Sequence, residues 1–175
     1  MATYALTSTQ TLNTGTSIPL LGFGVWDSPS HLTTTSCLSA LKTGYRHIDT
    51  AQAYGNEAEV GHSIAQSGLP RDQIFATSKI VSPAEDGSED ATYRKVLDSV
   101  DKIGGAEGYL DLMLIHNQAC GAEKIRVMWK AMERLVREGR IRAIGVSNFG
   151  VGTIEAMRGY AEVWPPAVNQ LEVSS

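Results

Sequence analysis

Four side chains that can transfer protons or carry charge stand at or just beyond the ends of short apolar runs. They are Asp49, Tyr54, Lys79 and His116. The runs are predicted to be parallel strands, and the carboxyl ends of such strands form one rim of a barrel or open sheet. We therefore expect these four side chains to face one opening, although they lie far apart in the sequence.

Each of these residues also has an ordinary structural explanation, since an aspartate can cap a helix, a lysine can be solvated, and a histidine or tyrosine can pack at a strand end. Together they suit a reaction at a carbonyl group. A phenol has a pKa of about 10, which a neighbouring ammonium lowers. Asp49 would keep Lys79 charged and aimed, and His116 would donate a hydrogen bond to the carbonyl oxygen. The set predicts an acid catalyst for a carbonyl compound.

Six apolar runs are each too short for a helix and have the composition of strands covered on both faces. They are LLGFGVW (20–26), RHID (46–49), QIFATSK (73–79), YLDLMLIH (109–116), IRAIGVS (141–147) and PAVNQ (166–170). A hairpin is expected before them, near residues 11–19.

Helical spacing of apolar residues separates several of these runs. The stripes are Val60 with Ile64, then Tyr93, Val96, Leu97 and Val100, then Ile125, Met128, Trp129, Met132, Leu135 and Val136. Asn56 and Ser88 are the expected N-caps, and Gly139 follows the third stripe where a C-cap belongs. Strands that alternate with helices indicate parallel strands joined by right-handed crossovers. We therefore predict a single α/β domain over residues 1–175.

The composition excludes several other classes of protein. The 175 residues are 42% hydrophobic and 19% charged with a formal net charge of −4, so neither a nucleic-acid partner nor an anionic membrane surface is expected. Cys37 and Cys120 have no metal-ligand spacing, which favours free thiols in a reducing compartment and no metal site. The polar N-terminus and the lack of a long apolar run predict a cytoplasmic protein.

Several segments resemble the signature segments of the aldo-keto reductases, which are NADPH-dependent (β/α)8 barrel enzymes that reduce aldehydes and ketones. These segments are GYRHIDTAQAYGNEAEVG, LMLIH, GRIRAIGVSNF and PAVNQLE, and they occur in the order and spacing of that family. The resemblance runs from LLGFGVW to NQLE, which is nearly the whole chain. It implies an oxidoreductase whose substrate is a small-molecule carbonyl compound.

The resemblance also implies roles for individual residues. Asp49, Tyr54, Lys79 and His116 match the catalytic tetrad of the family, with Tyr54 as the proton donor. A second set matches the residues that hold the nicotinamide carboxamide of NADPH, namely Ser147, Asn148 and Gln170. Taken without the other matching segments, Ser147 and Asn148 would instead be interpreted as a helix N-cap.

The number of strands departs from the family pattern. A (β/α)8 barrel takes about 250 residues, whereas this sequence has 175 residues and six predicted strands. We therefore expect an incomplete (β/α)8 barrel of about six parallel strands that lacks the last two strand-helix units. In the family, that missing portion holds the pyrophosphate, the adenine and the 2′-phosphate, so binding of NADPH is expected to be weak or lost.

Three functions fit this pattern. The first is an NADPH-dependent carbonyl reductase whose missing cofactor contacts come from another subunit. The second is a redox-neutral enzyme that isomerises, cyclises or dehydrates a carbonyl compound without a cofactor. The third is a non-catalytic remnant or an interaction protein. The open edges left by the first and sixth strands also predict a homodimer or another homo-oligomer.

Overall fold

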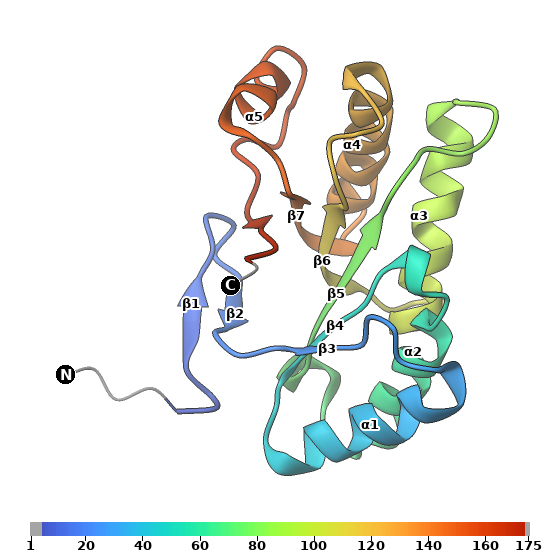
Figure 1. Ribbon diagram of the computed structural model, residues 1–175, viewed down its shortest axis with the longest axis vertical. Coiled ribbons are helices and arrows are strands. Elements are labelled where there is room, and N and C mark those ends of the chain that lie inside the picture. The colour runs from blue at the N-terminus through green and yellow to red at the C-terminus, as the bar shows by residue number, and fades with distance from the viewer. Residues whose placement is uncertain (1–4, 174–175) are drawn as a thin grey trace.

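The computed structural model describes residues 5–173 of the chain (Figure 1). Its main feature is a sheet of six strands, all parallel, that follow one another in chain order. The strands are β3 (Phe23–Gly24), β4 (His47–Asp49), β5 (Phe75–Ile80), β6 (Leu110–Ile115), β7 (Ile141–Ser147) and β8 (Asn169–Gln170). This order confirms the predicted incomplete (β/α)8 barrel, because neighbouring strands joined by crossovers in one direction curl the sheet.

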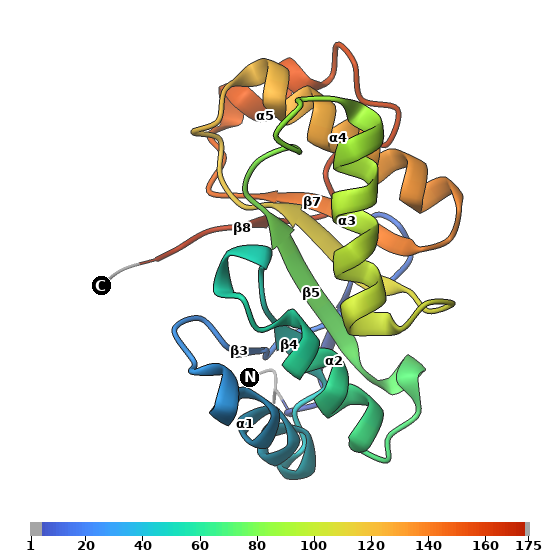
Figure 2. The same cartoon turned by 90° about the vertical axis from the view of Figure 1, so that its right-hand side faces the viewer.

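Five α-helices connect these strands, and the long helices pack on one side of the curved sheet (Figure 2). They are α1 (Ser30–Thr43), α2 (Glu57–Gln66), α3 (Glu89–Gly104), α4 (Ala122–Arg137) and α5 (Val151–Met157). Two short 3-10 helices, η1 (Gln52–Tyr54) and η2 (Arg71–Gln73), lie before α2 and β5. The three predicted apolar stripes fall in α2, α3 and α4 and supply much of their buried surface.

Helix α1 was not predicted from its periodicity, and its buried face explains why. That face consists of Thr33, Cys37, Ala40 and Leu41, of which only Leu41 is a large apolar residue. Small and polar residues pack well where a helix lies close to its neighbours, but they leave a weak hydrophobic pattern in the sequence.

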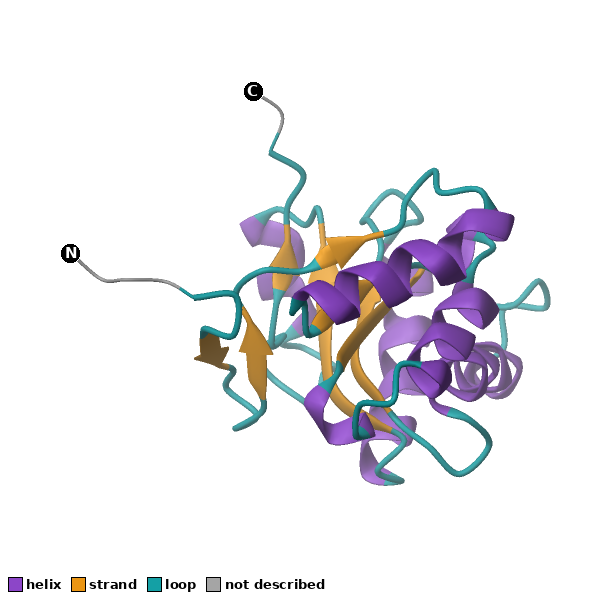
Figure 3. Cartoon of the chain, turned by 90° about the horizontal axis from the view of Figure 1, so that it is seen from below, coloured by secondary structure: helices purple, strands orange, loops and turns teal. Residues whose placement is uncertain are grey.

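The expected hairpin is present and covers the concave face of the sheet. It consists of β1 (Thr9–Thr11) and β2 (Ser17–Pro19), which pair antiparallel. Leu12 and Ile18 pack against an inner cluster formed by Phe75, Leu112, Leu114 and Ala143. Figure 3 shows this hairpin on the side of the sheet opposite the long helices.

The two edge strands are shorter than the runs that predicted them, because β3 and β8 each pair over two residues. Just before β3, Gly22 lies close to the side chain of His47, since a Cβ atom there would lie 2.8 Å from Nδ1 of His47. The chain can therefore approach the sheet only without a side chain at this position. Leu20, Leu21 and Trp26 on one edge, and Leu171 on the other, remain exposed.

Two of the three predicted helix caps are confirmed. Oγ of Ser88 accepts a hydrogen bond from the backbone of Ala91, and Gly139 has a φ of +73° just after α4. The prediction for Asn56 is correct in position and wrong in the hydrogen bond. Asn56 directly precedes α2, but its side chain makes no capping hydrogen bond. It accepts instead from the hydroxyl of Thr50 and donates to the carbonyl of Val25.

Within residues 5–173, no helix is both long enough and apolar enough to cross a membrane.

Candidate active site

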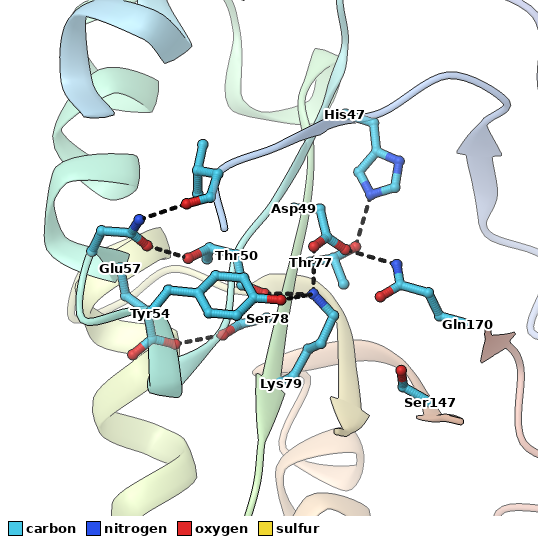
Figure 4. A network of polar contacts seen from close by, with 12 residues as sticks. His47, Asp49, Thr50, Tyr54, Glu57, Thr77, Ser78, Lys79, Ser147 and Gln170 are labelled. Carbon is cyan, nitrogen blue, oxygen red and sulfur yellow. Dashed lines mark hydrogen bonds and ion pairs between the residues drawn. The ribbon is translucent and has the colours of Figure 1, made fainter. Parts of the chain in front are cut away.

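The four predicted proton-transfer residues lie together at the carboxyl ends of the strands (Figure 4 shows three of them). Asp49 ends β4, Tyr54 ends η1, Lys79 is the penultimate residue of β5, and His116 follows β6. Parallel pairing aligns these ends, since Asp49 is opposite Thr77 and Lys79 is opposite Leu114. The register therefore brings residues from distant parts of the chain to one rim.

Lys79 is the centre of this group. Its side chain is 2% exposed and forms an ion pair with Asp49, which is 16% exposed. Nζ also donates to the carbonyl of Thr50 over 3.0 Å and lies 3.5 Å from the hydroxyl of Tyr54. An ammonium has three N–H donors, so these three oxygens satisfy a charge that would otherwise be costly to bury.

His116 lies beside Tyr54, with the two ring centroids 5.7 Å apart in an edge-to-face arrangement. Burial, and then the positive charge of Lys79, lower the pKa of His116. The imidazole is therefore neutral near pH 7 and has one N–H to donate. Within residues 5–173, Nδ1 of His116 is buried without a hydrogen-bond partner.

The pKa of Tyr54 moves in the direction opposite to the prediction. The sequence predicted that the ammonium of Lys79 would lower it, whereas burial, followed by the charges of Asp49 and Glu172, raises it. Asp49 is paired with Lys79 and offsets its charge, and the contact from Nζ to the phenol is long at 3.5 Å. Tyr54 is therefore held in its protonated form at neutral pH.

The three residues predicted to contact a carboxamide lie in the same pocket as Tyr54 and His116. Ser147 ends β7 and is buried, and Nδ2 of Asn148 donates to its hydroxyl over 3.2 Å. Nε2 of Gln170 donates to the second oxygen of Asp49 over 2.9 Å, which joins the last strand to the ion pair (Figure 4). The alternative of a helix N-cap is wrong, because α5 begins at Val151 after Gly150.

The pocket includes residues that were not predicted from the sequence. They are Trp26, Ala53, Leu171 and Glu172. Trp26 is 76% exposed in the structure, and its place at the end of the predicted strand LLGFGVW is the only mark of it in the sequence. No comparable signal marked Glu172, whose backbone N–H donates to Oδ1 of Asn148 over 3.0 Å.

Comparison with known proteins agrees with this geometry. The sequence profile of the Aldo/keto reductase family matches residues 21–175. The chain belongs to this family. It is 44% identical over 162 residues to an aldo-keto reductase of Mycobacterium sp. (strain KMS), and 40% identical over 169 residues to glyoxal reductase of Bacillus subtilis. These matches cover 93% and 96% of this chain.

The fold gives the same result as the sequence. The crystal structure of an aldo/keto reductase from Brucella melitensis superposes with a TM-score of 0.86 at 39% identity and covers 95% of this chain. The chain covers only part of each aldo/keto reductase, namely 57% of the mycobacterial protein, 59% of the glyoxal reductase and 63% of the Brucella chain. The six strands thus form a partial version of the (β/α)8 barrel of its relatives.

Proposed function

We propose that this chain carries the proton-transfer half of a carbonyl reductase site, with Tyr54 as the general acid. The observation that supports this most is that the Tyr54 hydroxyl lies 3.5 Å from Nζ of Lys79 in the pocket that also contains His116. The raised pKa of Tyr54 keeps a proton on the phenol, and the ammonium of Lys79 stabilises the phenolate as that proton leaves.

His116 and Asp49 have supporting roles in this proposal. The neutral imidazole of His116 donates a hydrogen bond to the carbonyl oxygen and thereby orients the substrate toward Tyr54. Asp49 keeps Lys79 charged and directed at the phenol. The substrate would be a small aldehyde or ketone, in agreement with the names of relatives such as glyoxal reductase.

The pocket also fits one end of a nicotinamide cofactor. Ser147, Asn148 and Gln170 present a hydroxyl and two amides, which complement the donors and acceptors of a carboxamide. Aldo/keto reductases generally use NAD(P)H, and bound NADPH would supply the hydride. Within residues 5–173, the pocket wall contains no lysine or arginine that could hold a phosphate.

This division of contacts predicts weak binding of NADPH by the 175-residue chain alone. Neutral hydrogen bonds exchanged with water contribute about 0.5–1.5 kcal/mol each, so a few of them give a dissociation constant of roughly millimolar or worse. A titration of NADPH fluorescence or calorimetric heat against the purified chain measures this constant. A micromolar constant for the isolated chain would overturn the expectation of weak binding.

The proposed reaction is tested by NADPH oxidation at 340 nm with glyoxal as the substrate and NADPH near millimolar concentration. We expect oxidation that depends on the aldehyde and is lost with His116→Phe. If the carbonyl compound were consumed in the complete absence of NADPH, or if NADPH were not oxidised at any aldehyde concentration, the reductase proposal would be wrong.

A further inference from the structure

The loop that presents Tyr54 is held on the side of the sheet away from the pocket by a second set of polar residues. We call it the Glu57 network, which consists of Gln52, Glu57, Ser78 and Ser99. Nε2 of Gln52 donates to Oγ of Ser99 over 2.8 Å, and Ser99 donates to Oε2 of Glu57 over 3.1 Å. The hydroxyl of Ser78 donates to Oε1 of Glu57, a contact drawn in Figure 4.

Three of the four residues of the network are buried where apolar packing would be expected, and Gln52 is half-buried. Glu57 is 5% exposed, and Ser78 and Ser99 are fully buried. The carboxylate of Glu57 accepts hydrogen bonds from two hydroxyls, and Lys102, the cation that influences its pKa, forms its own ion pair with Asp98. Because a buried carboxylate supported only by hydroxyls is costly, stability alone does not account for Glu57.

The connections of the network lead to both partners of the contact between Tyr54 and Lys79. Ser78 immediately precedes Lys79 in β5, and successive side chains of a strand point to opposite faces. Ser78 therefore reaches Glu57 on the outer face, while Lys79 reaches Asp49 and Tyr54 on the inner face. On the other side of the network, Gln52 is the first residue of η1, the helical turn that ends at Tyr54.

We propose that Glu57 is a positioning residue that holds the Tyr54 hydroxyl against Lys79, by fixing η1 through Ser99 and Gln52 and fixing β5 through Ser78. A positioning role is suited to this place, because a displacement of about 1 Å at a reacting group can lower a rate about a hundredfold. Any effect on turnover rests on the proposed reductase function, whereas the effect on the position of Tyr54 does not.

The test uses Ser99→Ala, which removes the hydroxyl that joins Gln52 to Glu57 and keeps a good helix former in α3. The chain is labelled with ¹³Cζ-tyrosine, and the signal of Tyr54 is identified by its loss in Tyr54→Phe. Because burial is the main cause that raises the pKa of Tyr54, a loosened η1 should lower that pKa toward its ordinary value of about 10. Hydrogen exchange at the amides of Tyr54 and Gly55, which donate to Ala51 and Gln52, should become about fivefold faster.

Ser63→Ala is the matched control. Ser63 is also a fully buried serine on a helix that covers the sheet, but its hydroxyl donates to Val60 within its own helix, α2. We expect this variant to leave both the Tyr54 titration and the exchange of these amides unchanged. If Ser99→Ala and Ser63→Ala changed them equally, or if Ser99→Ala changed neither, the positioning role would be wrong.

Gln52→Met provides a second variant in case Ser99→Ala fails to fold. Gln52 is half-buried, and methionine retains its length while removing the amide. The same shift of the Tyr54 titration is expected, and its absence would contradict the proposal. These spectroscopic measurements need no turnover, so they remain decisive if the reductase assay fails. Where turnover is present, Ser99→Ala should lower kcat several-fold with little change in KM.

Discussion

The central strands and the edge strands of this sheet contribute to the site in different ways. All residues of β5 and β6 are buried, and so is nearly all of β7. By contrast, β3 and β8 are two residues long and lie beside exposed apolar side chains. Lys79 and His116 come from the central strands, whereas Trp26 and Gln170 come from the edges (Figure 4 labels Lys79 and Gln170).

This difference separates the two tasks of the proposed reaction. Lys79 and His116 lie at the ends of strands that pair with neighbours on both sides, so their positions are well determined, and Tyr54 contacts both of them from η1. The groups proposed to contact the cofactor include Gln170, which lies on a strand with one neighbour. A site of this kind can retain its acid-base geometry while its cofactor contacts are weak.

The largest expected effect tests the central strands as a packed unit. Leu112 of β6 is fully buried in the inner cluster. Leu112→Ala should lower the free energy of unfolding by about 2–5 kcal/mol because it leaves a cavity. Urea unfolding followed by circular dichroism measures this loss. The control Leu171→Ala, at an exposed position beside β8, should change stability by less than about 0.5 kcal/mol. Equal losses at the two positions would remove the distinction between centre and edge.

The next effect concerns the proton donor. Tyr54→Phe should reduce kcat/KM by at least about a hundredfold, which is the usual contribution of a positioned general acid, without a change in fold. Tyr45→Phe is the matched control, since Tyr45 packs edge-on against Phe23 away from the pocket. The comparison is made by NADPH oxidation at 340 nm. If Tyr54→Phe turned over glyoxal at the rate of the control, Tyr54 would not be the acid.

A smaller effect is expected at the exposed edge, where the predicted homodimer would bury apolar side chains. Leu20 and Leu21 are exposed beside β3, and replacing both by serine should weaken the dimer by at least about tenfold, or 1.4 kcal/mol. Light scattering at micromolar concentration measures the mass. The control Leu32→Ser changes a leucine of similar exposure on α1 and should leave the mass unchanged. A monomeric parent chain at this concentration would refute the predicted dimer.

The smallest effect is a loss of stability in acid that arises on the inner face. Burial is the main cause that lowers the pKa of His47, whose Nε2 lies 2.9 Å from Oγ1 of Thr77. As the pH falls, the unfolded chain takes up a proton at His47 near pH 6.5, and the folded chain does so only at a lower pH. The contribution of His47 to the free energy of unfolding is therefore fully present above pH 6.5 and is lost as the pH decreases. Between pH 6.5 and 5.5 the loss should be roughly 1 kcal/mol.

This acid dependence can be assigned by substitution. Burial raises the pKa of Glu57 and Asp111, so these carboxyls contribute stability that is lost as the pH rises, which is the opposite sign. His47→Gln should therefore reduce the acid loss in urea unfolding and leave the part that arises from His116, whose pKa burial also lowers. His62→Gln on the exposed face of α2 should not reduce it. An unchanged acid slope in His47→Gln would show that the loss arises elsewhere.

The amino-acid sequence by itself determined the number and order of the strands and the convergence of the four polar residues on one rim. The physical reason is that these properties are local or topological. A run such as YLDLMLIH reveals a strand buried on both faces, and the carboxyl ends of neighbouring parallel strands lie side by side whatever connects them.

Only the tertiary structure decided how those residues interact. Burial raises the pKa of Tyr54, and the charges of Asp49 and Glu172 add to this effect. The side chain of Asn56 makes no capping hydrogen bond because it binds Thr50 and Val25 instead. The contact between Gln170 and Asp49 spans 121 positions of the chain. Charge balance and hydrogen-bond choice depend on distances of a few ångströms between such remote residues, and periodicity carries no information about those distances.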